Sequence, residues 1–417
     1  MFYLKPDNVI TKQDDMETQL AFSPHDEIKS AEMVASTVDL LSEILLRLPT
    51  KSVVRFKLVS KRWFHLISDP RFCQLLNPNP NPAVGLFLPL SASNSGYEFV
   101  PFSSDKSSFE FVKNHLPSGV IRILQSCNGL MLCCRKISSD DDPEYFVYNP
   151  TTKKHSCIPI PPKPDYETDR GISKRIRGIN LAFNPVESFR YKIVSACSFD
   201  SHFWIEVYSS HTRCWRVQSL QPFSSSADFE RGVYWNDAVH WMDTDVDNAR
   251  PLYFNVGTQT LSNMPKLPLA YSRHCKRDHY YFGESCDHLH FIDMRGPQVK
   301  LVVHELKRDY SEWFVKYRVD LSAVVVANPV MASIRGGDPM FWGGFVYEVL
   351  AAVRGEEEGD SFLVLRIPGK VVRYDIVLKS FRDLAETLER GIIVRSNSFK
   401  YPKVGGFQYI HSLCSSA

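Results

Sequence analysis

Residues 38–70 read VDLLSEILLRLPTKSVVRFKLVSKRWFHLISDP, and this stretch decides the fold of the N-terminal region of the chain. Its first half carries leucine and isoleucine at i, i+1, i+4, i+5 and i+8, the spacing of one face of an α-helix. Ser36 or Thr37 can cap the start of this helix, and a proline ends it. The face consists of Leu40, Leu41, Ile44, Leu45 and Leu48, and the proline is Pro49.

The same stretch predicts two further short helices. Thr50 can cap the second helix, and Ser60 can open the third, which the Asp69-Pro70 pair would stop. The second helix would present Val53, Val54, Phe56, Leu58 and Val59, and the third would present Trp63, Phe64, Leu66 and Ile67. The sequence therefore predicts a unit of three short helices.

This helical unit carries more apolar surface than it can bury alone. Sixteen of the thirty residues from 38 to 67 are apolar, and units of this size rarely sustain a core unaided. The apolar face must therefore pack on the rest of the chain or dock on another protein. The run NPNPNP at 77–82 forms a stiff, extended boundary after the helices, which favours docking on another protein.

After residue 83 the sequence pattern is that of β-strands. Short runs rich in Val, Ile, Tyr, Phe and Trp alternate with turn residues, and in one of them Phe203, Ile205 and Val207 would share a face. Many short strands at regular spacing indicate a sandwich, a barrel or a propeller. The clearest runs are 145–148, 203–208, 251–254, 289–292, 300–304, 362–367 and 371–376.

A degenerate internal repeat favours the propeller. A strand that ends in an aromatic residue, then a polar turn and a second strand followed by proline, recurs at VYNPTT (147–152), VYSSHT (207–212) and YFNVGT (253–258). The unit would be a β-hairpin that returns every ~40–60 residues, the range of propeller blades. The remaining chain then holds six or seven blades, with a large sandwich as the alternative fold.

Composition narrows the class of protein. Charged residues make up 23% of the chain and the net charge is +2, so no strong overall field favours nucleic acid or an acidic membrane surface. The first residues lack the apolar core of a secretory signal, and the most apolar run, 321–330, is only strand-sized. Ten scattered cysteines without a C-x-x-C pair indicate reduced thiols, so we expect the cytosol or the nucleus.

The pattern of residues 39–70 resembles an F-box, specifically that of plant F-box proteins. The second Leu-Pro of that motif is present as Leu48-Pro49, whereas Ser36-Thr37 stand near the place of the first. Later segments resemble the F-box-associated, kelch-like domains of the same plant family. They are NGL (128–130), YNPTT (148–152), GVYWN (232–236) with HW (240–241), YFGES (281–285), WFVKY (313–317) and IPGK (367–370).

The resemblance implies a domain order and a division of labour. We expect a disordered arm at 1–34, the F-box at 35–76, a linker at 77–83 and a propeller at 84–412. In that family the F-box binds a Skp adaptor, and through it a cullin, while the β domain recruits the protein to be ubiquitylated. The expected Skp-adaptor contacts are Leu40, Leu41, Ile44, Leu45, Leu48, Pro49, Val53, Val54, Phe56, Val59, Trp63, Leu66 and Ile67.

Several polar and aromatic features allow two interpretations each. The basic residues of the helical stretch are either a solvated helix face or a match for an acidic adaptor surface, with nucleic acid a weaker alternative. Trp63 either fills the helical core or is buried at the interface. The basic residues are Arg47, Lys51, Arg55, Lys57, Lys61 and Arg62.

A cluster of histidines and cysteines in the β region also needs an interpretation. Cys286, His288 and His290 would share one face of a strand, which permits a zinc site, but no paired zinc-ligand framework accompanies them. We interpret them, with His274, Cys275 and His279, as ordinary strand residues. The acidic runs 140–142 and 356–358 are interpreted as solvated loop tips, with a grip on a basic peptide as the alternative.

Two functions of different classes follow from these patterns. The favoured one is a non-catalytic adaptor of a Skp–cullin–F-box ubiquitin ligase, without cofactor or metal and without nucleic-acid or membrane partners. No phosphate-binding loop, dinucleotide fingerprint, nucleophile elbow or H-E-x-x-H motif occurs. The alternative is a propeller enzyme or ligand-binding protein that acts outside a ligase. A third possibility is an F-box protein that binds the Skp adaptor but works outside any ligase.

Overall fold

A computed structural model of the protein divides the chain into two compact units, Met1–Pro49 and Thr50–Ala417. The predicted arm up to residue 32, Pro49 and the Asn-Pro run at 77–82 lie outside the described residues. No helix within the described ranges is both long and apolar enough to span a membrane. The structure describes residues 33–34, 37–48, 50–76, 83–89, 96–103, 121–135, 143–161, 175–199, 202–219, 226–243, 250–267, 280–294, 299–332, 347–355, 357–386 and 405–413.

The first unit contains helix α2, Val38–Leu46, as the leucine spacing predicts. Thr37 is its N-cap residue, but the Thr37 hydroxyl donates to the Met33 carbonyl at 2.9 Å and not to the helix. Arg47 is the C-cap residue, and its backbone N–H bonds to the Ile44 carbonyl at 3.2 Å. Helix α2 therefore begins and ends close to the positions that the sequence indicates.

The second unit begins with α3 (Thr50–Phe56), α4 (Lys61–Ser68) and α5 (Pro70–Leu76). Ser60 caps α4 as predicted, because its side-chain oxygen accepts from the Trp63 N–H at 3.2 Å. Helix α5 was not predicted. Asp69 ends α4 but also accepts from the Arg71 N–H at 2.8 Å, and a proline fits the first position of a helix. The same Asp-Pro pair that stops one helix therefore starts another.

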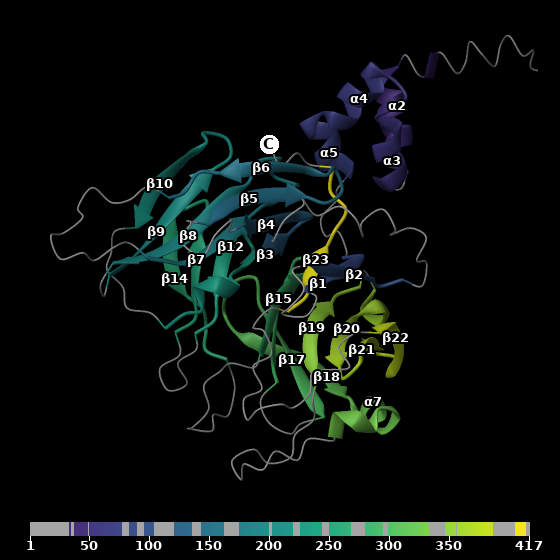
Figure 1. The fold of residues 1–417 in the computed structure, drawn as a ribbon, viewed down its shortest axis with the longest axis vertical. Coiled ribbons are helices and arrows are strands. Elements are labelled where there is room, and N and C mark those ends of the chain that lie inside the picture. Colours follow the sequence, from purple (N-terminus) through teal and green to yellow (C-terminus); the bar gives the residue numbers. More distant parts are fainter. Residues whose placement is uncertain are drawn as a thin grey trace, which may run out of the picture. The chain divides into compact units, whose positions relative to one another are not determined.

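The rest of the second unit is a β-propeller of six antiparallel sheets, within the predicted six or seven (Figure 1). Blade 1 contains β1 (Gly85–Pro89), β2 (Tyr97–Pro101) and β23 (Phe407–Tyr409). Blade 2 contains β3 (Ile121–Cys127), β4 (Leu130–Arg135), β5 (Glu144–Asn149) and β6 (Lys154–Ile158), and blade 3 contains β7 (Arg175–Ala182), β8 (Lys192–Phe199), β9 (His202–Ser209) and β10 (Cys214–Ser219).

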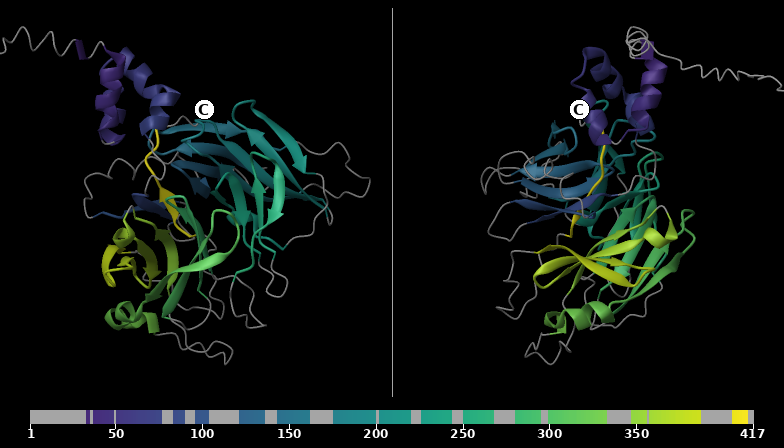
Figure 2. Two further views of the ribbon diagram at one scale, coloured as in Figure 1. Left: turned by 180° about the vertical axis from the view of Figure 1, so that it is seen from behind. Right: turned by 90° about the vertical axis from the view of Figure 1, so that its right-hand side faces the viewer.

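The remaining three blades follow in chain order, and Figure 2 shows them from behind and from the side. Blade 4 contains β11 (Val233–Trp235), β12 (Ala238–Trp241), β13 (Leu252–Asn255) and β14 (Thr260–Asn263). Blade 5 contains β15 (Tyr280–Ser285), β16 (His288–Asp293), β17 (Lys300–Leu306) and β18 (Trp313–Asp320), and blade 6 contains β19 (Glu348–Val353), β20 (Phe362–Ile367), β21 (Lys370–Asp375) and β22 (Ser380–Glu386).

The last strand of the chain completes the first blade. β23 pairs antiparallel with β1, so that Tyr409 lies opposite Gly85 and Phe407 opposite Phe87. The end of the chain is also attached to blade 2, where the Asn149 side-chain amide donates to the Ser412 carbonyl at 3.0 Å. These bonds close the ring of blades, since blade 1 then packs on both blade 2 and blade 6 through shared buried clusters.

The predicted repeat corresponds to one hairpin of the blade. VYNPTT, VYSSHT and YFNVGT connect the third and fourth strands of blades 2, 3 and 4. In each, the residue that follows has a left-handed backbone: φ is 59° at Lys153, 54° at Arg213 and 62° at Gln259. Each also bonds its N–H to the carbonyl four residues back at 2.8 Å. The shared turn explains why this hairpin gives the clearest internal repeat.

The blades are buried on both faces, which the alternation in β9 does not reveal. Phe203, Ile205 and Val207 share a face as predicted and pack in a cluster with Trp241 and Phe254 of blade 4. On the opposite face of the strand, Tyr208 and Glu206 are buried as well. A blade in the middle of a propeller has a neighbour on each side, so neither of its faces is left to solvent.

The apolar run 321–330 has the length of a strand, but it forms helix α7 (Ser322–Ala327) and the start of a 3₁₀ turn (Pro329–Ala332). Leu321 and Val324 are buried three residues apart, while Val326 is exposed, which is a helical pattern. Asp320 accepts from the Ser322 N–H at 2.9 Å and so satisfies a donor at the helix start.

We expect ring closure to depend on the ring of Tyr409 more than on its hydroxyl. Tyr409 is buried against Phe87 and Phe99, and its hydroxyl bonds to Thr151 at 3.0 Å. Tyr409→Ala should lower the free energy of unfolding by about 3–5 kcal/mol, and Tyr409→Phe by about 1 kcal/mol. Denaturant unfolding followed by tryptophan fluorescence measures both. Equal losses in the two variants would contradict this account of the closure.

Candidate functional sites in the helices and the channel

Helix α2 divides its predicted apolar face into a buried side and an exposed side. Leu41 and Leu45 are buried, whereas Leu40 and Ile44 are each 47% exposed. Val38, the first residue of the helix, is 48% exposed, but it stands three and seven residues before Leu41 and Leu45 and so lies on their side of the helix. Leu48 is half-buried beyond the helix end. Residues four apart lie on the same side of a helix, so Leu40 and Ile44 form one apolar surface.

The helices of the second unit show a similar division. Val53 and Ile67 are buried, and Trp63 packs edge-on against Phe56 with ring centroids 5.4 Å apart. Trp63 therefore contributes to the packing of α3 against α4. Val54, Phe56, Trp63 and Leu66 are half-buried, and Leu58, Val59 and Phe64 are exposed.

The charges on these helices are mostly at the surface. Arg47 pairs with Glu43 at 2.6 Å one turn earlier, and both side chains are exposed. Arg55, Lys61 and Arg62 are exposed as well. Exposed pairs contribute little to stability, so the Arg47–Glu43 pair adds little to the stability of α2.

The propeller encloses a central channel of about 600 Å³. Its walls are the innermost strands of all six blades, namely β3, β7, β11, β15, β19 and β23. Blades 2 to 6 each begin with this inner strand and repeat one strand order, so these inner strands run in the same direction. Residues that begin them therefore lie at one end of the channel, and residues that end them lie at the other.

At the end where the inner strands begin, the buried charges are paired. The Nε of Arg231 lies 3.6 Å from the Asp228 carboxylate, and its guanidinium lies over the Tyr280 ring. Glu348 lies 3.3 Å from Arg366. Burial raises the pKa of Glu348, and the charges of Arg366 and Arg231 oppose that shift. Each of these two acids therefore has a cation beside it, although the Oε2 of Glu348 makes no hydrogen bond within the described residues.

At the end where the inner strands finish, the acid is Glu284 of β15. Its Oε1 accepts from the Asp287 N–H at 2.7 Å, and no lysine, arginine or histidine among the described residues pairs with it. Burial, with the nearby charge of Asp287, raises the pKa of Glu284 to about 7. This carboxyl changes its charge near neutral pH.

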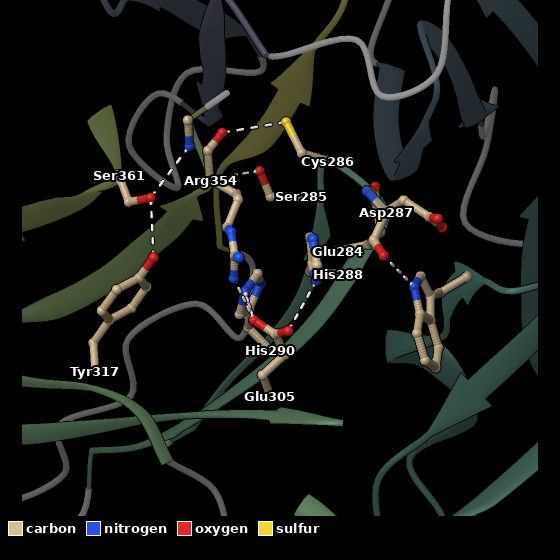
Figure 3. Close-up of polar contacts among 12 residues, drawn as sticks. Glu284, Ser285, Cys286, Asp287, His288, His290, Glu305, Tyr317, Arg354 and Ser361 are labelled. Atoms are coloured by element: carbon tan, nitrogen blue, oxygen red, sulfur yellow. Dashed lines mark hydrogen bonds and ion pairs between the residues drawn. The ribbon is translucent and has the colours of Figure 1, made fainter. Parts of the chain in front are cut away.

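A second buried polar cluster joins blades 5 and 6 (Figure 3). Glu305 of β17 accepts from His288 at 2.9 Å, lies 3.5 Å from His290 Nε2, and pairs with Arg354, just after β19, at 2.5 Å. Burial would raise the pKa of Glu305, but the hydrogen bonds from both histidines lower it overall. The carboxylate therefore stays charged and binds the two blades together.

The cluster around Glu305 contains two of the three residues that the sequence suggested as a possible zinc site. His288 and His290 lie on β16 and engage Glu305, but Cys286 is not on their strand. It lies in the β15–β16 turn with φ 51°, and its thiol donates to the Arg354 carbonyl at 3.2 Å. No metal-binding group of three was found within the described residues. His274, Cys275 and His279 lie outside them, as do the acidic run 140–142 and Glu356.

Comparison with known families assigns both the helical region and the propeller. Residues 38–75 match the F-box domain, and residues 94–284 match the F-box associated beta propeller domain. The F-box protein At5g07610 of Arabidopsis thaliana is 32% identical over 86% of this chain and 87% of its own length. The chain belongs to the F-box proteins.

Other relatives of this F-box protein are also from Arabidopsis thaliana. The F-box protein At5g03970 is 25% identical over 73% of this chain and 74% of its own length. The F-box/LRR-repeat/kelch-repeat protein At2g27520 is 28% identical over 56% of this chain and 60% of its own length. The predicted family, a plant F-box protein with an F-box-associated propeller, is confirmed.

Sequence reasoning found the helical surface but missed the buried polar groups. Glu284 stands in the quoted motif YFGES, yet nothing in that motif shows that the carboxyl lines a channel. Glu305 and Arg354 are 49 residues apart and on different blades, so no local spacing relates them.

The cluster around Glu305 predicts a contrast between two arginines. Arg354→Met should lower the free energy of unfolding by about 3–5 kcal/mol, because it leaves a buried carboxylate without its partner. Arg308→Met should cost less than about 1 kcal/mol, because Arg308 pairs with Asp287 while 62% exposed. Urea unfolding of the two variants measures both. Losses of the same size would show that the Glu305 cluster does not hold the blades together.

Proposed function

We propose that this F-box protein is the substrate-recognition subunit of a Skp–cullin–F-box ubiquitin ligase. The observation that carries the proposal is the exposed apolar surface of α2 within the matched F-box region. Leu40 and Ile44 would otherwise each remain 47% exposed to water. Burying such side chains against a groove of the Skp adaptor is the usual way a short helix binds a partner.

The expected contacts divide into two roles under this proposal. The exposed and half-buried residues would touch the Skp adaptor directly, and the buried ones would hold the helices in shape. Leu41, Leu45, Val53 and Ile67 are the buried group. Exposed apolar side chains that become fully buried dominate the energy of an interface, while surrounding contacts contribute less. The adaptor in turn would link the protein to a cullin.

The propeller would hold the protein to be ubiquitylated. A closed ring of blades is a rigid support, and loops on such supports commonly carry binding residues. The mechanism is effective concentration: a bound protein keeps its lysines near the ubiquitin-conjugating enzyme without any chemistry by this chain. We place this assembly in the cytosol or the nucleus, where its ten cysteines would stay reduced.

The alternative of a propeller enzyme finds less support in the channel. Its described lining contains carboxyls and arginines but no histidine. Cys127 lines it too, but burial raises the pKa of that thiol and keeps it protonated. A protonated thiol is a poor nucleophile. The channel groups are thus better suited to binding than to catalysis.

The test is the affinity of the full chain for a plant Skp adaptor. Leu40→Ala/Ile44→Ala should weaken binding by about 30-fold, because two exposed anchors worth about 1 kcal/mol each are lost. Since both residues are exposed, the free energy of unfolding should change little. Titration calorimetry with purified adaptor measures the affinity.

Val326→Ala/Val330→Ala is the matched control, because both valines are exposed apolar residues near α7. This variant should bind the adaptor as the wild type does. If the wild type fails to bind, or if both double variants bind equally well, the helical surface is not the adaptor site. The ligase role would then lack its basis.

A further inference from the structure

The Glu284 end of the channel has an acidic group that the protein leaves uncompensated. One oxygen of Glu284 accepts from the Asp287 N–H, and the other has no hydrogen-bond partner among the described residues. The carboxyl lines the channel, and burial is the largest cause of its raised pKa. Such a carboxyl either takes up a proton or, when ionised, is stabilised by a cation that a ligand supplies.

The groups around Glu284 do not supply that positive charge. The titratable neighbours that couple to it are all acids: Asp287 in the adjoining turn, Tyr281 on the same strand and Cys127 at the end of β3. Asp287 has its own cation, Arg308, which is largely exposed. The amide of Gln408 on β23 donates to the Glu284 carbonyl at 3.0 Å and not to its carboxylate.

Tyr281, the second residue of β15, carries another unsatisfied polar group, and its side chain extends along the strand toward Gly283. Its side chain is only 9% exposed, and its hydroxyl makes no hydrogen bond within the described residues. The Ala352 backbone and the Gln408 amide lie close enough to lower its pKa, but neither has the geometry of a hydrogen bond to it. The hydroxyl lies over Gly283, where a Cβ would come within 2.4 Å of it. Tyr281, Gly283 and Glu284 are all among the residues that line the channel.

The opposite end of the channel makes the contrast clear. There Glu348 lies 3.3 Å from Arg366 and Asp228 lies 3.6 Å from Arg231, so each of these acids has a cation beside it, although the Oε2 of Glu348 makes no hydrogen bond within the described residues. Glu284 differs in that no cation of the described residues pairs with it, and the Tyr281 hydroxyl on the same strand makes no hydrogen bond within those residues. A group with a positive charge and several N–H donors fits both acceptors.

We propose that the Glu284 end of the channel binds a primary ammonium or guanidinium group. The cation would donate to the free oxygen of Glu284 and to the Tyr281 hydroxyl, with Gly283 leaving room for the approach. Its source is either a small free amine or guanidine, or a lysine or arginine side chain of a bound polypeptide. The proposal concerns the propeller alone and does not rest on the proposed adaptor role.

Binding of this kind has a defined pH dependence. The cation binds the ionised carboxyl, and the pKa of Glu284 stands at about 7 in the unliganded protein. Below that pH a proton must leave before the cation binds, so affinity falls about tenfold for each pH unit. Above it the carboxyl is already ionised, and affinity levels off.

The experiment compares N-butylguanidinium with N-butylurea, its uncharged isostere, by titration calorimetry on the full chain. We expect the cation to bind at least tenfold tighter than the urea at pH 8, and about tenfold more weakly at pH 6 than at pH 8. A capped Gly-Arg-Gly peptide is the second probe. Binding of the peptide as well supports a polypeptide as the source, and binding of N-butylguanidinium alone supports a small cation.

Substitutions at Glu284 and Tyr281 test whether these two side chains bind the cation. Glu284→Gln keeps the shape of the side chain and should lower affinity for N-butylguanidinium at least tenfold, while Tyr281→Phe should lower it several-fold. Glu230→Gln, at the other end of the channel, is the matched control and should bind as the wild type does. Melting temperatures show that each variant is folded.

Two results would overturn the proposal. One is equal affinity of the wild type for the cation and the urea at pH 8, and the other is wild-type affinity in Glu284→Gln. Retention of the Skp adaptor by Glu284→Gln is measured in parallel. A change in adaptor binding by this variant bears on the proposed ligase role. A loss of cation binding with unchanged adaptor binding bears only on the channel site.

Discussion

No blade of this propeller can bury its faces without its neighbours, and the rest of the structure depends on that constraint. Phe203, Ile205 and Val207 of blade 3 meet Trp241 of blade 4, and similar shared clusters join blades 4, 5 and 6. A ring of blades that closes on itself gives each blade a neighbour on both faces. The ring in turn places six inner strands around one axis, and this produces a channel whose two ends differ in chemistry.

The interior polar groups show two ways of placing charge in such a ring. Around Glu305 the chain supplies two histidines and Arg354, so the carboxylate is fully satisfied and links two blades. Around Glu284 it supplies one backbone N–H and further acids. A satisfied buried charge gives specific packing, whereas an unsatisfied one is costly and needs a functional reason. The first cluster is therefore structural, and the second suits a ligand.

Structural features that depend on the spacing of nearby residues could be predicted from the sequence. Features that depend on contacts between residues far apart in the chain could not. The leucines of α2, the Ser60 cap and the strand runs follow from periods of 3.6 and 2, which are local. The repeated hairpin follows from a turn of fixed geometry. Helix α5 was missed because Asp69-Pro70 signals both an end and a start, and α7 because its length suits a strand.

The candidate sites follow the same division. The apolar face of α2 could be located, but its separation into exposed Leu40 and buried Leu41 depends on packing that no single helix pattern contains. The F-box is a contiguous motif, so its residues could be identified from the sequence alone. The open carboxyl of Glu284 was not, because its surroundings come from β3, β15 and β23, which are far apart along the chain.

The pairing of β1 with β23 also sets an order of events during synthesis. Gly85 finds its partner Tyr409 only after the intervening blades have left the ribosome. Until then β1 presents an open edge, and open edges invite pairing with other chains. Contacts across such a separation make folding slow. The newborn protein therefore passes through a stage at which the inner edge of its first blade is unpaired.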